Sequence, residues 1–462
     1  MRTIRIALIG WVSITLLIAL QFVWVYSRHG LAGFQNYMQE APYTHIPITL
    51  ASVSMTWLLA GLLLALILGG RITRTSAPSW AGFFAIAFLY LNILRERVRY
   101  GDIDYYTQAA FALLRHQPLP DTYFYPPLWA TLLSFLAPFE ADGILLIAWI
   151  ANVLSLLLFY FLLQRTLELY QFSRPAAALT AALFILVNMP VLRTLMYVQV
   201  NFHVMNFILL SLLLYKDRIF LSALMLALAV HFKASPAVLV LAFLLDFNWK
   251  WLIWFVISLV AIAGLTVAIY GTGPYYDFIH NFLFISAPHA LSMHDSSFDS
   301  AIGMALSYLR ADPNMVSMLV LFAKGITGLA AILLAVRSQG FFSAKGANAH
   351  LLNSIVPLFP AMTLLSPLVW EHHALFLALP YLLLLKKLET SAEWVSFGTA
   401  YLLVFLVPTF DYFPWSYGRL VGMLILFILL WKTIVRTGNS FFPRANTWAD
   451  DLVHGRTPAK TA

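Results

Sequence analysis

The chain contains no cysteine among its 462 residues, and charged side chains make up only 10% of it. The absence of cysteine excludes disulfides, zinc-thiolate sites, iron–sulfur clusters and thiol catalysis. The scarcity of charge argues against a soluble enzyme, because soluble domains carry about 25% charged residues. Instead, 61% of the residues are hydrophobic, which is more apolar surface than a single globular core can bury. We therefore expect lipid to surround much of the protein.

Acidic residues are also few, with 20 Asp and Glu against 28 Lys and Arg, and the net charge is +8. A positive balance can indicate nucleic-acid binding. An excess of Lys and Arg beside apolar spans is, however, the usual pattern of a polytopic membrane protein. We therefore predict a lipid bilayer and no nucleic acid as a partner.

Long apolar runs predict an all-α polytopic membrane protein with about fourteen crossings. The first run, at about 6–25, follows Arg2 and Arg5 and lacks the cleavage site of a signal peptide, so we interpret it as a span. The stretch 126–139 is either a re-entrant or interfacial helix or an additional span. The other predicted spans lie at about 47–70, 79–94, 143–163, 176–190, 203–215, 219–232, 237–249, 251–270, 315–336, 350–367, 373–386, 393–409 and 418–435.

The charge distribution predicts an orientation for these spans. With the N-terminus in the cytoplasm, most Lys and Arg fall in cytoplasmic loops and most carboxylates fall outside. Residues 1–436 then form one transmembrane domain with outer loops at 95–125 and 271–314, followed by a cytoplasmic tail at 437–462. This assignment places both termini in the cytoplasm. It gathers polar segments on the outer face, at 99–106, 122–127, 197–201, 231–236, 287–299 and 366–373.

Ionisable groups at membrane depth are costly and tend to mark a functional cavity. Asp102 and Asp104 stand beside Tyr105 and Tyr106 in the first outer loop. A carboxylate in a partly dry, aromatic site has a raised pKa and can act as a general base toward a hydroxyl. The alternative for one of the two is a helix N-cap.

Cations on the outer face are candidates for binding a phosphate. Arg95, Arg97 and Arg99 precede the aspartates, and Lys233 follows an apolar segment, two residues after His231. Arginine pairs bidentately with phosphate oxygens, and an ammonium can neutralise a phosphoryl leaving group. The alternative for each is a side chain that extends its charged end to water.

The outer histidines are candidates for a cavity rather than for a metal. His372 and His373 follow Trp370 and Glu371, and adjacent helical residues point about 100° apart, so we expect one of the two to face the cavity. The alternative is an interfacial aromatic belt with polar neighbours. A second group in one outer loop consists of His289, His294, Asp295 and Asp299. Their spacing could bind a divalent cation, but we favour a loop in which His294 contacts a sugar or that is simply solvated.

Taken together, these segments resemble glycosyltransferase family 87, the polyprenyl-phosphate-mannose-dependent α-mannosyltransferases with the GT-C membrane fold. Four blocks carry the likeness, within about residues 100–380. They depart from the family pattern at Val369, at Glu371 and at 115–117, where a Gly is missing. The matching residues are Asp102, Tyr106, Ala109, Ala110, Tyr125, Pro126 and Pro127; Gln199 and Asn201; Lys233 and Pro236; and Ser366, Pro367, Trp370, His372 and His373.

The resemblance implies a GT-C-type helix bundle in the inner (plasma) membrane with an extracytoplasmic catalytic loop. It implies a hexosyltransferase that moves a hexosyl group, with mannosyl favoured, from a polyprenyl-phosphate donor to a hydroxyl of a glycolipid, glycan or protein, with inversion and without a metal or nucleotide cofactor. Asp102 would deprotonate the acceptor, Lys233 would meet the donor phosphate, and His372, or His373 in reserve, would orient the base or stabilise charge. Arg97 and Arg99 are the other candidates for phosphate binding. The candidates for sugar or acceptor binding are Asp104, Tyr106, Tyr125, Gln199, Asn201, Trp370, Glu371 and His294.

A transporter or flippase of lipids or solutes is the alternative function, because a polytopic chain with intramembrane charge fits that class as well. Transporters tend to contain internal repeats with sites near the bilayer midplane. The sequence shows no clear repeat, and its polar segments gather at one surface. The sequence therefore favours the transferase.

Overall fold

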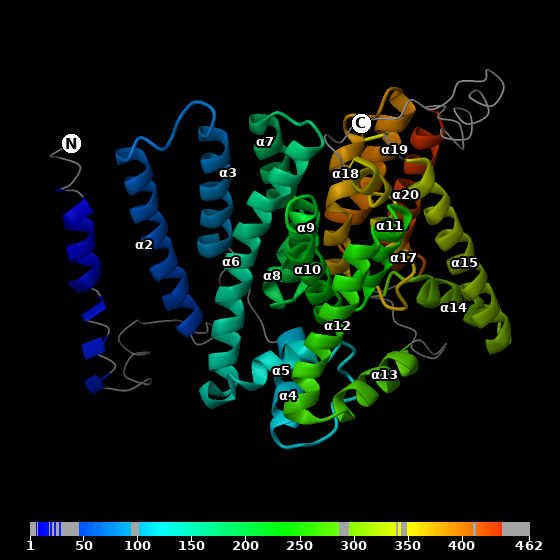
Figure 1. The fold of residues 1–462 in the computed structure, drawn as a ribbon, viewed down its shortest axis with the longest axis horizontal. Coiled ribbons are helices and arrows are strands. Elements are labelled where there is room, and N and C mark those ends of the chain that lie inside the picture. Colours follow the sequence, from blue (N-terminus) through cyan, green and yellow to red (C-terminus); the bar gives the residue numbers. More distant parts are fainter. Residues whose placement is uncertain are drawn as a thin grey trace, which may run out of the picture.

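The computed structural model describes residues 6, 8–17, 19–20, 23–24, 27–28, 46–93, 101–285, 295–338, 341–342, 349–409 and 413–436. All regular secondary structure in these ranges is helical, which confirms the all-α prediction (Figure 1). The first half contains α2 (Ile46–Leu68), α3 (Ala77–Phe88), η1 (Leu89–Ile93), α4 (Asp102–Leu114), α5 (Leu128–Ser134), η3 (Ala137–Phe139), α6 (Glu140–Leu169), α7 (Arg174–Leu186), α8 (Met189–Met196), α9 (Asn201–Leu214) and α10 (Ile219–Phe232).

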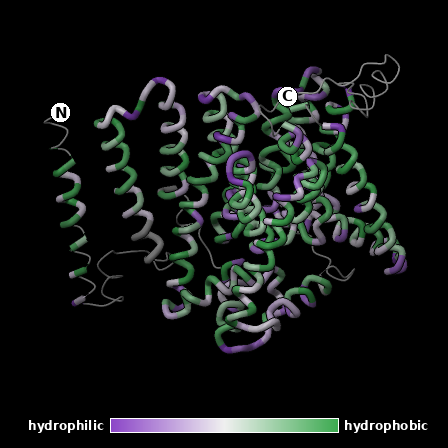
Figure 2. The backbone as a smooth tube through the Cα atoms, viewed as in Figure 1, coloured by the Kyte–Doolittle hydropathy of each residue, from purple (hydrophilic) through white to green (hydrophobic). Residues whose placement is uncertain are grey.

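The second half continues with shorter and longer helices in alternation. Its elements are η4 (Ser235–Leu239), α11 (Val240–Leu245), α12 (Trp249–Tyr270), α13 (Gly273–Ile285), α14 (Phe298–Tyr308), α15 (Pro313–Arg337), α16 (Ala349–Ser354), α17 (Leu358–Leu364), η5 (Glu371–Leu377), α18 (Ala378–Leu384), α19 (Ser391–Tyr401), η6 (Leu402–Leu406), η7 (Trp415–Tyr417) and α20 (Gly418–Arg436). Hydrophobic residues run along the long helices, and hydrophilic residues gather mostly at helix ends and connections (Figure 2).

Within the described ranges, four helical segments are long and apolar enough to cross a membrane: Ala137–Leu169, Trp249–Tyr270, Pro313–Arg337 and Trp415–Arg436. The pair α7 and α8, bent by 63°, would make a fifth span if it crosses as one unit. These helices indicate a multi-pass membrane protein. The number of these helices is smaller than the number of crossings, about fourteen, that the apolar runs predict.

The difference has a physical cause in the lengths of the helices. The apolar runs predicted the positions of the helices well, and α9 and α10 match their runs closely. Each of these two has 14 residues, which at 1.5 Å per residue gives about 21 Å against a hydrocarbon layer of about 30 Å. Other runs contain prolines and are divided into short helices, so that the run 350–367 forms α16 and α17 and the run 373–386 forms η5 and α18. The stretch 126–139 contains only α5 and η3 and is too short to cross.

The helices are also joined by polar contacts in their interior. The Asn206 amide on α9 donates to the Ser155 carbonyl oxygen and hydroxyl on α6, at 2.7 and 2.8 Å. The hydroxyls of Thr131 on α5 and Thr266 on α12 lie 3.1 Å apart. Such interhelical hydrogen bonds help to hold helices together where apolar burial alone gives little preference for one arrangement.

Three helices near the polar site lie toward one end of the bundle. Figure 1 shows α4, α5 and α13 together at the lower end of the view, away from the upper ends of α7, α15 and α19. The predicted outer loop 95–125 thus contains the helix α4, and the loop 271–314 contains α13 and α14.

Candidate active site

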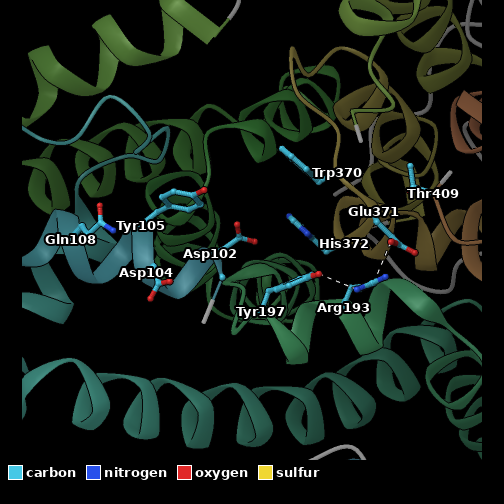
Figure 3. Close-up of a pocket in the computed structure, with 11 residues that line it drawn as sticks. Asp102, Asp104, Tyr105, Gln108, Arg193, Tyr197, Trp370, Glu371, His372 and Thr409 are labelled. Atoms are coloured by element: carbon cyan, nitrogen blue, oxygen red, sulfur yellow. Dashed lines mark hydrogen bonds and ion pairs between the residues drawn. The ribbon is translucent and has the colours of Figure 1, made fainter. Parts of the chain in front are cut away.

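A cavity of about 720 Å³, called here the large cavity, opens beside the start of α4. In Figure 3 the Asp102 carboxylate and the His372 imidazole face the same space, with Trp370 on one side and Tyr197 on the other. The cavity thus brings together segments far apart in the sequence. Its lining residues are Gly101, Asp102, Asp104, Tyr105, Gln108, Arg193, Tyr197, Trp370, Glu371, His372 and Thr409.

Asp102 is the first residue of α4, and the N-cap position belongs to Gly101. The alternative that Asp102 or Asp104 caps the helix is therefore wrong, although both lie in its first turn, where the helix dipole favours negative charge. A Cβ on Gly101 would lie 2.6 Å from Cδ1 of Tyr197. The missing side chain thus allows the start of α4 to approach Tyr197 and places Asp102 at the cavity wall.

The protonation of Asp102 is tuned by its surroundings. Burial raises the pKa of Asp102 to about 6, while the nearby Lys233 ammonium acts in the opposite direction. Burial also raises the pKa of Asp104. A carboxylate with a pKa close to the working pH is suited to general base catalysis, since it is still ionised and has gained basicity.

The helical run is interrupted between α7 and α8, and this interruption brings Arg193 and Tyr197 to the cavity. After α7 ends, the Asn188 side chain accepts a hydrogen bond from the Val191 amide at 3.0 Å, and Pro190 stands in the first turn of α8. These are standard signals for the start of a new helix. Nη1 of Arg193 then donates to the Tyr197 hydroxyl at 3.0 Å. The sequence pattern did not single out Arg193 or Tyr197 as a site residue, although Asn188 and Pro190 within an apolar run could have indicated the break between the helices.

Glu371 lies between two arginines. Its Oε2 is 3.4 Å from Nε of Arg193, and its Oε1 is 3.1 Å from Nη2 of Arg419 on α20. Arg419 also donates to the carbonyl oxygens of Val404 and Val407 at 3.2 Å each, at the end of η6. This network ties the C-terminal helices to the residue that precedes His372.

We expect Arg419→Met to destabilise the protein by about 3–5 kcal/mol, because it removes the buried partner of Glu371 and also the donor to the Val404 and Val407 carbonyl oxygens. The Arg419 side chain is 2% exposed, against 29% for Arg193. Arg193→Met should therefore have a smaller effect, about 0–1 kcal/mol. Thermal unfolding of the purified protein, followed by tryptophan fluorescence, measures both variants. Equal losses of stability in the two variants would show that Arg419 contributes no more to this network than Arg193 does.

A second cavity of about 240 Å³, called here the small cavity, adjoins the first at Trp370, which lines both. Its walls are mainly apolar, and Lys233 is the one Lys or Arg among its lining residues. The full lining is Phe124, Tyr125, Lys233, Ala234, Ser235, Val238, Phe282, Met362, Leu365, Ser366, Pro367, Leu368, Trp370 and His373.

Lys233 directly follows α10 and is buried. Its Nζ donates to the Asn201 side-chain oxygen at 3.1 Å and lies 5.6 Å from the ring centre of Tyr125 and 5.5 Å from that of Phe376. Burial lowers the pKa of Lys233 to about 7, and the negative charge of Asp102 opposes this shift. The Asn201 amide also donates to the His372 carbonyl at 3.2 Å, so Asn201 links the lysine to the histidine segment.

Gln199 lines neither of the two cavities. Its side-chain oxygen accepts from the hydroxyls of Tyr106 at 2.8 Å and Tyr125 at 3.4 Å. The preceding residue, Val198, has a φ of 51°, an unfavourable conformation for a β-branched side chain. Backbone strain of this kind persists where the surrounding structure imposes it, often near functional sites. Here it occurs in the connection between α8 and α9, next to the buried Gln199.

The two adjacent histidines line different cavities: His372 the large one and His373 the small one. Their ring centres are 4.6 Å apart and their planes differ by 84°. Both belong to η5, a 3₁₀ helix, in which successive side chains point about 120° apart. The sequence led us to expect one histidine at a single cavity, and it did not reveal the second cavity.

Asp295 acts within the fold rather than at either cavity. Its carboxylate accepts hydrogen bonds from the Val369 amide at 2.7 Å and from the Ser297 amide and hydroxyl at 2.9 and 2.7 Å. These bonds fix the segment that carries Trp370 to the start of α14. Asp299 forms an ion pair with Lys324.

The remaining sequence candidates cannot be placed in this site. Arg95, Arg97, Arg99, His289 and His294 lie outside the described residues. Within the ranges that the structure describes, no group of three or more His, Asp or Glu side chains could hold a metal ion.

Comparison with known proteins adds one match. The family model of glycosyltransferase family 87 matches residues 123–367, more than half of the chain. No match was found among the curated proteins. The matched range covers the Tyr-Pro-Pro element, Gln199, Asn201 and Lys233, while Asp102 precedes it and the histidines follow it.

Proposed function

The chain belongs to glycosyltransferase family 87, and from this premise we propose that it moves a hexosyl group from a polyprenyl-phosphate donor to an acceptor hydroxyl, with inversion. Mannose is the sugar we favour, and the acceptor is a glycolipid, a glycan or a protein. The observation that carries the proposal is the grouping of Asp102 and His372 in one cavity, with Lys233 lining the adjoining one.

In the proposed reaction, Asp102 accepts the proton of the acceptor hydroxyl. The oxygen attacks the anomeric carbon from the face opposite the phosphate, and the bond from that carbon to the phosphate oxygen breaks. Polyprenyl phosphate leaves with the bonding electrons, and Lys233 compensates its charge, an interaction that is strongest where water is excluded. His372 stabilises charge near Asp102, and Asn201 positions Lys233 through the hydrogen bond between their side chains. No metal or nucleotide takes part in this scheme.

We assign both cavities to the extracytoplasmic face of the inner membrane, with residues 1–436 as one GT-C-type domain and the tail 437–462 in the cytoplasm. The distribution of Lys and Arg among the loops supports this orientation. The gathering of α4, α5 and α13 at one end of the bundle agrees with it (Figure 1). Arg97 and Arg99 remain candidates for the donor phosphate.

The proposal is tested by incubating membranes that contain the protein with radiolabelled polyprenyl-phosphate mannose and an acceptor extract. A transferase produces a new labelled glycoside that resists mild acid, whereas a transporter moves the label across the membrane without forming a glycosidic bond. Vesicles of both orientations identify the face that holds the site. Absence of labelled glycoside with mannose, glucose and galactose donors alike would overturn the proposal.

The pH dependence of kcat/KM follows from the two shifted groups. The Asp102 carboxylate, with its pKa of about 6, is lost as the pH falls through that value. The Lys233 ammonium, with its pKa of about 7, is lost as the pH rises. We therefore expect a bell-shaped profile with limbs near these two values, because kcat/KM reports the free enzyme. Initial rates at low donor concentration between pH 4.5 and 9 measure it.

The variant Lys233→Met identifies the group responsible for each limb of the pH profile. Lys233→Met removes the alkaline limb and also raises the pKa of Asp102, since the ammonium no longer favours the carboxylate. The acid limb should therefore move to higher pH. An acid limb that stays in place would assign it to another group.

A further inference from the structure

Asp295 is a buried carboxylate that the proposed mechanism does not use. On the basis of the proposed function, we propose that Asp295 is a positioning residue for sugar transfer: it holds Val369, and through Val369 it fixes Trp370 in the cavity walls. Asp295 itself lines neither cavity. Its influence on the reaction therefore passes through the chain segment that it binds.

This segment, residues 366–373 and called here the cavity segment, forms walls of both cavities. Every residue in it except Val369 lines the large cavity, the small cavity or both. Val369 is 0% exposed and belongs to the hydrophobic core. Because η5 begins only at Glu371, residues 366–370 lie outside any helix. Their polar backbone groups therefore need partners elsewhere in the fold.

Both polar backbone groups of Val369 are hydrogen-bonded to one short stretch of chain. The Val369 amide donates to Oδ1 of Asp295 at 2.7 Å, and the Val369 carbonyl accepts from the Ser296 amide at 2.8 Å. A hydrogen bond to an ionised carboxylate is roughly twice as strong as one between neutral groups. The residue of the cavity segment that turns away from the cavities is thus held by the rest of the fold, and Asp295 supplies the stronger contact.

Asp295 is in turn fixed to the C-terminal helices. Its carboxylate accepts from the Ser297 amide at 2.9 Å and from the Ser297 hydroxyl at 2.7 Å. The same hydroxyl caps α14, because its oxygen accepts from the Ser300 amide at 3.1 Å. The Ser300 carbonyl accepts at 3.2 Å from the hydroxyl of Tyr417 in η7, directly before α20. Asp295 therefore connects Val369 to a hydrogen-bonded frame of helices.

The surroundings of Asp295 indicate a role in position and not in contact with substrate. The residue is 1% exposed, and its two oxygens accept from three donors of the protein itself, on Ser297 and Val369. Burial raises the pKa of Asp295 to about 7, while these hydrogen bonds act in the opposite direction. An amide oxygen at the place of Oδ1 can accept the same two backbone bonds, so the geometry can be kept without the charge.

A displacement of Val369 would reach the residues in the cavities directly. Trp370 follows Val369, and its amide donates to Nδ1 of His373 at 3.2 Å, while its carbonyl accepts from the His373 amide at 3.0 Å. These bonds lie at the start of η5, which also carries His372. A misplacement of about 1 Å can lower a rate about a hundredfold. We therefore expect the loss of Asp295 to slow the chemical step.

Three variants of Asp295 separate position from charge. Asp295→Asn removes the charge and keeps an acceptor oxygen for the two backbone amides. Asp295→Glu keeps the charge and moves the oxygens outward by a methylene group, and Asp295→Ala removes the acceptor. We expect kcat to fall less than about threefold in Asp295→Asn and about 10–100-fold in the other two. Single-turnover rates, taken well below the melting temperature of each variant, measure the effect.

Glu393→Ala is the matched control for the loss of a buried carboxylate. Glu393 is also 1% exposed and accepts from the backbone amides of Glu389 and Thr390 at 2.9 and 3.2 Å. It belongs to α19, which lies at the end of the bundle opposite α4 (Figure 1). We expect this variant to melt at a lower temperature with an unchanged kcat. An equal loss of kcat in Glu393→Ala and Asp295→Ala would show a general loosening of the fold and overturn the proposal.

Hydrogen exchange of the Val369 amide measures the contact without any sugar transfer. The full-length protein in lipid nanodiscs is incubated in deuterated buffer, and peptides from the cavity segment are analysed by mass spectrometry. We expect exchange to be about tenfold faster in Asp295→Ala than in the wild type and in Asp295→Asn, because the amide loses its acceptor. Unchanged exchange in Asp295→Ala would show that Asp295 does not hold the segment.

Failure of the positioning role and failure of the proposed function give different results. If Asp295→Glu preserves kcat and Asp295→Asn loses it, the charge is what matters and the positioning role is wrong. This pair also decides the question if Asp295→Ala does not fold. If the wild-type protein transfers no sugar from any donor, the proposed function fails, and the exchange rates alone then decide whether Asp295 fixes the cavity segment.

Discussion

Replacing Asp102 with asparagine is expected to lower kcat for sugar transfer about a thousandfold, within the range of about 10²–10⁴ that a positioned general base contributes. Asparagine has nearly the same shape and cannot accept the proton of the acceptor hydroxyl. Because Asp102 already begins α4 without serving as its cap, the helix should form normally in the variant. Single-turnover rates with the radiolabelled donor measure the effect on the chemical step.

Asparagine variants of two other aspartates serve as controls for Asp102→Asn. Asp104 lies in the same turn and the same cavity, and Asp104→Asn should act mainly on the KM for the acceptor. Asp217 is exposed in the connection between α9 and α10, and Asp217→Asn should leave the rate unchanged. Retention of more than a tenth of the wild-type kcat by Asp102→Asn would assign the base to a different residue.

Replacing Lys233 with methionine is expected to lower kcat/KM for the donor about 10²–10³-fold, the usual loss when one charge-stabilising contact to a transition state is removed. Methionine can still pack against the rings of Tyr125 and Phe376, which Lys233 contacts in the structure. The charge that develops on the departing phosphate then has no ammonium beside it.

The stability of this variant distinguishes a chemical role from a structural one. Removing a buried ammonium relieves its desolvation, which offsets the lost hydrogen bond to Asn201. We therefore expect an unchanged or higher melting temperature together with the loss of transfer. Lys250→Met, at an exposed position on α12, is the reference for surface charge. A Lys233→Met protein that unfolds early but transfers sugar at the normal rate would show that Lys233 only supports the fold.

The positions of the helices could be predicted from the sequence because apolar runs are a local property. The predicted runs 219–232 and 251–270 correspond to α10 (Ile219–Phe232) and α12 (Trp249–Tyr270) almost residue for residue. The number of crossings could not be predicted in the same way. Whether an apolar helix of 14 residues such as α9 crosses, stops inside the bundle or pairs with a neighbour depends on what packs around it.

The candidate site could be predicted in part. Asp102, Lys233, Trp370 and His372 stood out as polar residues in apolar surroundings, and the structure brings them to adjoining cavities. Arg193 did not stand out, because a single arginine near a helix end has an ordinary explanation at the membrane interface. Only the 63° bend between α7 and α8 turns it toward Glu371.

The sequence by itself determined that this protein is a helical membrane protein and which residue types its polar segments carry, since both follow from local composition. The tertiary structure decided that two cavities meet at Trp370 and that His372 and His373 face one cavity each. It also decided that Asn201 holds Lys233 and the His372 backbone rather than lining either cavity. The physical reason is that cavities form between segments distant in the chain, so their shape depends on helix lengths, breaks and packing angles that no local pattern encodes.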